Sequence, residues 1–403
     1  MISVTDPMKW LFVTTQFPWP ITHGQWLRVY HLVRALRRQG DDVALLTCCD
    51  DATTDEGVVA YEELGARILE GPGRKHRSKG QPRSFLGPYA FDGEMAEAVA
   101  QHSRSMDAVV LSHSRMLQYS REASHSGCVI ADIGDDPVLE YSRRRQTGAP
   151  TSGVLWRMKT RLGRARYERQ GLANVNAATF VSDADAQSFA RRHPGIKTQC
   201  ISNGADADYF RRPDKHTDND QSPTLVFTGH MGNPNNRWAA EYLVHAVAPL
   251  IWSKYRDVGI KIVGADPTED VLSLAGARVE VTGTVPDIRP YLWNATLVTL
   301  PMQSGTGIKN KLLEAWAAGA AVVATPLACQ GVDARDGENL AIAASAEQFA
   351  AKIIELLSDD QQRAQLGAEG RRTIEQSFSW ESAAVQLRQV AGSVAVPTAA
   401  TQR

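Results

Sequence analysis

Short, continuous apolar runs alternate with a segment of helical periodicity at the start of the chain. Residues 10–15 form such a run, residues 27–36 place apolar side chains three or four positions apart, and residues 42–47 form a second run. A strand, a helix and a strand in this order predict a βαβ unit. Runs that are apolar on both faces suit a buried parallel sheet.

The same pattern recurs on both sides of a polar segment. Further strands are predicted in the first half at 66–69, 108–112, 129–132, 178–181 and 198–201. Residues 211–223 are polar and include Pro213 and Pro223, which predicts a linker. Beyond it, strands are predicted at 225–228, 260–263, 279–281, 297–300 and 321–324, and helices at 237–253, 308–318, 346–357, 360–375 and 380–390.

This pattern predicts an α/β protein with two doubly wound, Rossmann-like domains that face a central cleft. The length of 403 residues agrees, because an ordinary domain has about 150 residues. We expect an N-terminal domain at 1–210, a linker at 211–223, a C-terminal domain at 224–378, a helix at 379–392 that packs back on the N-terminal domain, and a loose tail at 393–403. Such sheets bind ligands at the carboxyl ends of their strands, so the loops there are the candidate sites.

Composition narrows the class of protein. Lys and Arg number 44 against 45 Asp and Glu, so the net charge of -1 provides no global attraction for nucleic acid or membrane. The five cysteines are scattered without metal-ligand spacing, which favours free thiols in a reducing compartment. Because no signal-peptide core and no run of 18 apolar residues occur, we expect a cytoplasmic protein, soluble or peripheral to a membrane, and no metal site.

Residues 297–319 form the most informative stretch. A strand is followed by a glycine loop and a helix, and the first turn of such a helix presents N–H groups to an anion. Lys309 and Lys311 oppose the helix dipole, which a bound diphosphate would explain, and Glu314 could accept hydrogen bonds from a ribose diol. The alternative is that the glycines only form a turn and the lysines are solvated. The donor-binding candidates here are Gly305, Thr306, Gly307, Ile308, Asn310 and Lys311.

A second loop of the same kind follows the predicted strand at 225–228. Gly229 and His230 precede a polar turn and a helix, and the histidine could donate a hydrogen bond to a phosphate oxygen. A turn histidine in solvent is the alternative. His113, which follows the predicted strand at 108–112, is the candidate for a contact with sugar or acceptor, or else a loop histidine without a role.

Seven motifs in order along the chain resemble those of a family-4 type glycosyltransferase with the GT-B fold, nearest to the bacterial sugar transferases of exopolysaccharide systems. They lie at 17–28, 130–136, 167–168, 202–210, 227–231, 281–290 and 305–319. Three departures from the family pattern concern the donor. Thr306 stands where the first Glu of the E-x7-E motif is expected, and His230 stands where an Arg is expected. The lysine expected a few residues after His230 is missing, and Asn235, Asn236 and Arg237 lie nearby. Lys309 and Lys311 could supply the missing charge.

The resemblance implies a retaining transfer from a nucleotide-diphospho-sugar to a saccharide, without metal or cofactor. It implies that Lys309 is the electrophilic clamp, that Glu314 binds the ribose, and that the backbone near Thr284 and Val285 holds the base. The catalytic candidates are Lys309, Glu314 and His113. Gly24 is assigned to donor binding. Candidates on the acceptor side are Arg28, Asp132, Asp135 and Glu168.

The segment 141–169 carries nine basic residues and one acidic residue. It suits either a peripheral contact with an anionic membrane, where a lipid-linked glycan would be the acceptor, or a solvated helix face. No nucleic-acid-binding module accompanies it. The leading hypothesis is therefore a glycosyltransferase of exopolysaccharide or cell-surface glycan synthesis. A sugar-nucleotide epimerase, a natural-product glycosyltransferase and a non-catalytic nucleotide-sugar binding protein are the alternatives.

Overall fold

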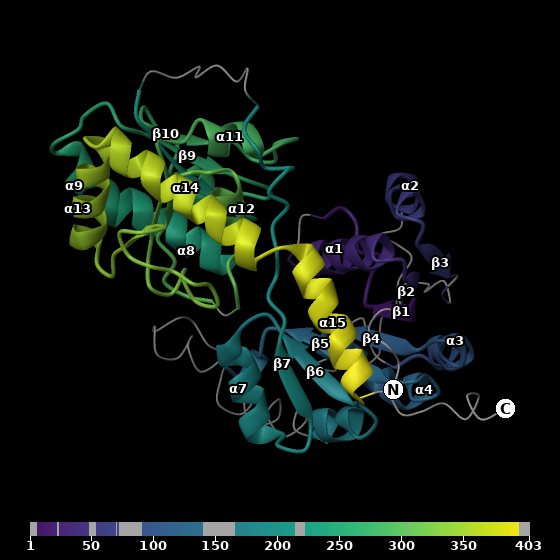
Figure 1. Ribbon diagram of the computed structural model, residues 1–403. Coiled ribbons are helices and arrows are strands. Elements are labelled where there is room, and N and C mark those ends of the chain that lie inside the picture. Colours follow the sequence, from purple (N-terminus) through teal and green to yellow (C-terminus); the bar gives the residue numbers. More distant parts are fainter. Residues whose placement is uncertain are drawn as a thin grey trace. The chain divides into compact units, whose positions relative to one another are not determined.

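The computed structural model describes residues 6–21, 24–47, 54–69, 71, 91–139, 166–213, 222–305 and 307–394. The chain divides into two compact units, each with its own parallel sheet (Figure 1). Of the residues that the structure describes, the N-terminal unit takes in those from 6 to 139, from 166 to 201 and from 380 to 394, and the C-terminal unit takes in those from 202 to 379. The predicted fold class, α/β with two Rossmann-like domains, is confirmed.

The N-terminal unit contains a seven-stranded parallel sheet in the order β3-β2-β1-β4-β5-β6-β7. Its strands are β1 (Lys9–Thr14), β2 (Asp42–Thr47), β3 (Arg67–Leu69), β4 (Ala108–Ser112), β5 (Val129–Gly134), β6 (Ala177–Phe180) and β7 (Lys197–Cys200). Its helices are α1 (Gly24–Arg38), α2 (Asp55–Glu63), α3 (Gly93–Ser103), η2 (Ser114–Tyr119, 3-10), α4 (Ser120–Ala123), α7 (Asp183–Arg192) and α15 (Trp380–Val394). Because β1 lies between β2 and β4, the strand order reverses beside it.

Alternation along β1 builds a core on each face of this sheet. Trp10 and Phe12 belong to one buried cluster, and Leu11 and Val13 belong to the other. The helix α15, at the yellow end of the chain, contributes Trp380 to the same cluster as α1 (Figure 1). The last helix of the sequence is therefore part of the N-terminal unit.

The C-terminal unit contains a six-stranded sheet in the order β10-β9-β8-β11-β12-β13, again parallel throughout. Its strands are β8 (Thr224–Thr228), β9 (Gly259–Val263), β10 (Val279–Val281), β11 (Leu297–Leu300), β12 (Val322–Ala324) and β13 (Ala341–Ile342). Its helices are α8 (Pro234–Tyr242), η3 (Leu243–Val247, a π-helical segment), α9 (Ala248–Trp252), α10 (Glu269–Leu272), α11 (Arg289–Trp293), α12 (Asn310–Ala317), α13 (Ala346–Leu357) and α14 (Asp360–Ser377).

Apart from α15, the N-terminal unit ends at Ile201, whereas the boundary predicted from the sequence is at 210. The intervening residues are bonded within the C-terminal unit. The Ala205 N–H donates to Phe378 O over 2.9 Å, and the Trp293 indole N–H donates to Phe210 O over 2.8 Å. These contacts join residues 202–210 to the C-terminal unit.

The helix predicted at 237–253 begins three residues earlier. Asn233 caps α8, because its side-chain oxygen accepts from the Asn235 N–H over 2.9 Å, and Pro234 occupies the first turn, where no N–H is needed. This early start brings two asparagines, Asn235 and Asn236, into the first turn of α8. Both side chains make hydrogen bonds to residues at or beyond the carboxyl end of β11.

Candidate functional site

The candidate site lies at the carboxyl ends of β8 and β11. These neighbouring strands stand at the centre of the sheet, and the strand order reverses between them, as at the ligand-binding crevice of doubly wound sheets. The chain leaves β8 through the loop 229–233 and leaves β11 through the loop 301–309. The topology thus brings together the two glycine loops that the sequence analysis singled out separately.

The loop after β8 is fixed by backbone contacts with the loop after β9. Gly229 N–H donates to Val263 O over 3.0 Å, and Met231 N–H donates to Ala265 O over 2.7 Å. A Cβ atom added to Gly264 would lie 1.9 Å from Gly229 O, so only glycine allows this approach. The backbone at Gly229 is therefore held in a single place.

The loop after β11 folds against the first turn of α8. The buried Ser304 hydroxyl donates to Asn235 Oδ1 over 2.6 Å. Gly305 (φ +119°) and Gly307 (φ +67°) both have positive φ angles, which glycine adopts without strain. Thr306, between them, lies outside the described residues.

Lys309 occupies the N-cap position of α12 and is only 8% exposed. Its ammonium group donates to Gly307 O over 2.9 Å, inside its own loop. A lysine offers no acceptor to the N–H groups of the first helical turn, and its charge opposes the helix dipole. The N-terminus of α12 thus concentrates positive charge beside a glycine loop, which suits a bound anion.

Lys311 reaches from α12 toward the loop after β8. Its Nζ donates to Asn236 Oδ1 over 2.7 Å and lies 4.5 Å from the centre of the Phe227 ring. A Cβ atom added to Gly229 would lie 2.7 Å from this nitrogen, so the ammonium group sits directly against the glycine. Two side chains and the backbone of Gly229 therefore surround one cation.

The charges on α12 change each other's ionisation. Burial lowers the pKa of Lys311 to about 7, the Glu314 carboxylate opposes this change, and the Lys309 charge adds to it. Burial also raises the pKa of Glu314 to about 7, and Lys311 opposes that change. An anion bound beside these lysines would favour the charged form of Lys311. The site is therefore electrostatically suited to a diphosphate.

The other donor-side candidates surround this centre in the C-terminal unit. His230 Nε2 lies 2.8 Å from Asp266 Oδ2, and Asp266 has a positive φ angle of +52°. Ile308 is buried, and Asn310 Oδ1 accepts from Asn203 Nδ2 over 2.8 Å. Exposed Thr284 and half-buried Val285 lie beyond the carboxyl end of β10, at the same edge of the sheet.

His113 and Gly24 lie in the N-terminal unit. His113 follows β4 with a strained φ of +83°, and its Nδ1 accepts from the Arg115 N–H over 3.1 Å. With Nδ1 as acceptor, the neutral ring carries its proton on Nε2. Gly24 begins α1 and is exposed, and the next residue, Gln25, donates to Ser112 O at the end of β4 over 3.3 Å.

Three acceptor-side candidates prove to be buried in ion pairs. Arg28 forms a bidentate pair with Asp132, with the shortest N–O distance at 2.9 Å, and also donates to Ile201 O. Glu168 lies 3.3 Å from His193 Nε2. Asp135, in contrast, is exposed. Their burial gives Arg28, Asp132 and Glu168 an evident structural role in the N-terminal unit.

The sequence analysis did not assign Asn235, Asn236 and Ser304 to the site. Asn235 and Asn236 were recognisable only as polar residues near the place where the family pattern expects a lysine, and Ser304 only as a polar residue in the loop after β11. Their partners lie 69 and 75 positions away along the chain. The adjacency of β8 and β11 is what brings them together.

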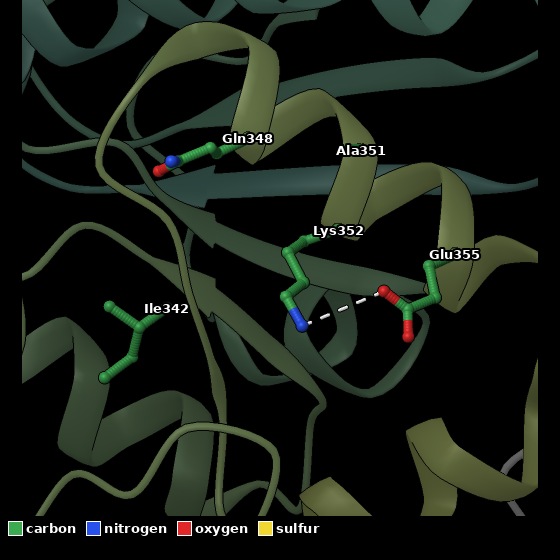
Figure 2. Close-up of a pocket in the computed structure, with 5 residues that line it drawn as sticks. All are labelled: Ile342, Gln348, Ala351, Lys352 and Glu355. Atoms are coloured by element: carbon green, nitrogen blue, oxygen red, sulfur yellow. Dashed lines mark ion pairs between the residues drawn. The ribbon is translucent and has the colours of Figure 1, made fainter.

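A surface pocket of about 390 Å³ lies elsewhere in the C-terminal unit, against α13 (Figure 2). It is lined by Ile342, Gln348, Ala351, Lys352 and Glu355. Lys352 and Glu355 point toward each other at 3.8 Å, and Gln348 accepts from the Ala344 N–H. The charged groups of this pocket therefore pair with each other, and the side-chain oxygen of Gln348 is bonded to the backbone.

Two features are absent from the part of the chain that the structure describes. There, no group of three or more His, Cys, Asp and Glu side chains is placed to hold a metal ion. No helix in the same part is long and apolar enough to cross a bilayer. Most of the basic segment 141–169 lies outside the described residues, which resume at Arg166.

The fold is shared with several solved structures. The chain is similar to HepE (Alr3699) of Anabaena in complex with UDP, with 16% identity, a TM-score of 0.69, and coverage of 96% of this chain and 100% of that one. It is similar to sucrose-phosphate synthase of Thermosynechococcus elongatus, with 18% identity, a TM-score of 0.71, and coverage of 96% and 98%. The glycosyltransferase WaaG, involved in lipopolysaccharide biosynthesis, shows 15% identity, a TM-score of 0.63, and coverage of 94% and 99%.

The family comparison concerns the unit that contains the candidate site. No curated protein matches this sequence. Residues 222–359 match the family model described as "Glycosyl transferases group 1", and they include both glycine loops, Lys309, Lys311 and Glu314. This match and the GT-B fold together support a glycosyltransferase as the enzyme class of the chain.

Proposed function

We propose that the protein is a retaining glycosyltransferase that moves a sugar from a nucleotide-diphospho-sugar to a saccharide acceptor. The observation that carries the proposal is the convergence of Lys309 and Lys311 with two glycine loops at the carboxyl ends of β8 and β11. The group 1 match over the same residues supports it. So does the HepE structure, in which that protein binds UDP-glucose.

In this proposal the donor diphosphate binds between Gly229 and the N-terminus of α12. Lys309 and Lys311 neutralise the charge that develops as the diphosphate leaves, which is the role that a metal ion plays in other transferases. Glu314 accepts hydrogen bonds from the ribose, and the loop at Thr284 and Val285 holds the base. No metal or cofactor is required by this scheme.

The transfer step involves one bond made and one broken. The acceptor hydroxyl oxygen bonds to the anomeric carbon on the face from which the diphosphate departs, and the bond from that carbon to the phosphate oxygen breaks. A phosphate oxygen of the leaving group takes the hydroxyl proton. His113 in the N-terminal unit, with its proton on Nε2, is proposed to contact the sugar or the acceptor.

The acceptor is proposed to be a growing exopolysaccharide or cell-surface glycan, either free or lipid-linked. The basic segment 141–169 supports the lipid-linked form, because each near-surface Lys or Arg adds about 1 kcal/mol of attraction to an anionic membrane. The location proposed with this acceptor is the cytoplasm or the inner face of the cell membrane. An epimerase of the same fold and a natural-product glycosyltransferase are the competing functions.

Thermal unfolding with UDP, GDP, dTDP and ADP tests the donor site. One nucleotide at 100 times its Kd should stabilise the wild-type chain by about 2.7 kcal/mol, and Lys309→Ala should lose most of that effect. Product analysis with the matching nucleotide sugars then separates the functions. A glycosyltransferase forms a glycoside on a saccharide acceptor, whereas an epimerase returns an isomeric nucleotide sugar. Failure of every nucleotide and nucleotide sugar to bind would refute the proposal.

A further inference from the structure

One side chain, Asn236, connects the two halves of the candidate site. Its Nδ2 donates to His230 O over 2.9 Å, and its Oδ1 accepts from Lys311 Nζ over 2.7 Å. The neighbouring Asn235 accepts from Ser304 over 2.6 Å. A single turn of α8 therefore bonds to the loop after β8, to the loop after β11 and to α12.

The amide of Asn236 is suited to this place because it donates and accepts at once. A carbonyl oxygen, His230 O, faces its nitrogen, and an ammonium group faces its oxygen. The start of α8 is fixed by the Asn233 cap, so the amide has a defined position. Neither leucine nor lysine could make both bonds.

The ammonium group of Lys311 meets charged groups from several elements. Glu314 and Lys309 act on it from α12 and its N-cap, and the loops after β8 and β9 carry His230 and Asp266, which pair with each other. Its direct hydrogen-bond acceptor, however, is the neutral amide of Asn236. A neutral acceptor orients the cation without placing a second negative charge beside it, and a bound anion would favour the charged form of Lys311.

We propose that Asn236 is a positioning residue, which holds Lys311 against Gly229 so that its ammonium group meets the donor diphosphate. This inference rests on the function proposed above and assigns a role that the sequence motifs did not. According to this inference, the diphosphate site depends on the contact between α8 and α12 as well as on the glycine loop after β8.

UDP binding by isothermal titration calorimetry between pH 6 and 9 tests the inference in the full chain. Asn236→Ala should weaken binding at pH 7 about tenfold, since hydrogen bonds to charged groups have effects of this order. Asn236→Asp places a carboxylate beside Lys311. The pH at which UDP affinity falls on the alkaline side should then rise by about 1 unit or more. Asn233→Ala is the matched control, because it removes the α8 cap but no bond to Lys311.

The control separates positioning from helix stability. Asn233→Ala should lower Tm without moving the alkaline limb of the binding profile. If Asn236→Asp and wild type have superimposable profiles, or if Asn236→Ala weakens binding no more than Asn233→Ala does, Asn236 does not position Lys311.

A measurement without ligand keeps the inference separate from the proposed function. The ε-carbon NMR signal of Lys311, assigned by its loss in Lys311→Arg, is titrated in the ligand-free chain. Its midpoint should move upward in Asn236→Asp and stay unchanged in Asn233→Ala. An equal midpoint in all three chains refutes the contact, whereas a moved midpoint without binding of any nucleotide refutes only the proposed function.

Discussion

The two units share one strand topology but treat buried charge in opposite ways. Near the reversal of strand order in the N-terminal unit, Arg28 pairs with Asp132 in a bidentate ion pair, with 3% and 5% of the side chains exposed. At the reversal in the C-terminal unit, Lys309 donates to a backbone carbonyl and Lys311 donates to an amide oxygen. One unit compensates its cation with a carboxylate, and the other orients its cations with neutral acceptors.

The hydrogen-bond partner of a buried cation, more than its residue type, indicates whether the cation stabilises the fold or binds a ligand. A buried arginine with its own carboxylate has little to gain from a ligand, and loss of either partner leaves the other uncompensated. A lysine that is hydrogen-bonded to an amide near a helix N-terminus stands where a bound anion is favoured. Substitution of these charged residues should therefore lower the free energy of unfolding in the N-terminal unit and the affinity for nucleotide in the C-terminal unit.

The largest expected effect is on the folding of the N-terminal unit. Arg28→Ala should reduce its free energy of unfolding by about 3–5 kcal/mol, because Asp132 would stay buried without its partner. Chemical denaturation measures this loss. The control is Arg38→Ala, whose pair with Glu381 is 60% and 50% exposed and should contribute below about 1 kcal/mol. Equal losses in the two variants would contradict the assigned structural role.

The next largest effect is on nucleotide affinity. Lys309→Ala should weaken UDP binding by about 1.5–3 kcal/mol, or roughly 10–150-fold, because a hydrogen bond between charged groups is lost. Calorimetry with the purified chain gives the value. Lys352→Ala, which removes a lysine from the pocket on α13, serves as the control and should bind UDP like wild type. A larger effect at Lys352 would move the nucleotide site to that pocket.

The pH dependence of UDP binding should be bell-shaped with its maximum near pH 7. Lys311 loses its charge as the pH rises through about 7, and the diphosphate needs that charge. Glu314 gains its charge as the pH rises through about 7, and the ribose hydroxyls need that carboxylate. Each limb should approach a tenfold change in Kd per pH unit. Above pH 7 the phosphates of UDP are ionised, so the alkaline limb belongs to the protein.

Glu314→Gln sharpens this test. It should remove the contribution of the carboxylate to the acid limb. It should also move the alkaline limb to lower pH, because the Glu314 carboxylate raises the pKa of Lys311. A profile that is flat between pH 7 and 9 in the wild-type chain is incompatible with a role for Lys311 in binding the diphosphate.

The smallest effect is expected at Gly229. In Gly229→Ala the new methyl group would lie 2.7 Å from Lys311 Nζ, and the flexible lysine would move away from the site. UDP binding should weaken roughly fivefold, or about 1 kcal/mol. Stability should also fall, because alanine is strained at the Gly229 φ of +156° and its methyl group would lie 2.8 Å from Asn236 Nδ2. Gly259→Ala is the control, because its nearest contact would be Thr224 Oγ1 at 4.0 Å. Equal affinities in both variants would place the ligand elsewhere.

Much of the fold follows from local sequence. The predicted strands at 42–47, 108–112, 279–281 and 297–300 coincide with β2, β4, β10 and β11. These strands can be recognised in the sequence as continuous apolar runs, because both faces of a parallel sheet are covered. The two-residue strand β13 was missed, because so short a segment has no readable period.

The site could be predicted only in part, for a physical reason. Glycine loops after strands and a lysine-rich helix start are local signals, so Gly229, Gly305, Lys309 and Lys311 could be found from the sequence. The partners that orient them depend on which strands are neighbours, and Asn236 meets Lys311 across 75 positions. Conversely, Arg28 and Asp132 looked like site residues, and only the structure shows that they pair with each other.

A crystal structure of the chain with UDP tests the central claim most directly. The account predicts the diphosphate at the carboxyl ends of β8 and β11, with phosphate oxygens about 3 Å from the ammonium groups of both Lys309 and Lys311. It also predicts that Lys311 keeps its bond to Asn236. A diphosphate bound elsewhere, or bound there without contact to either lysine, would contradict it.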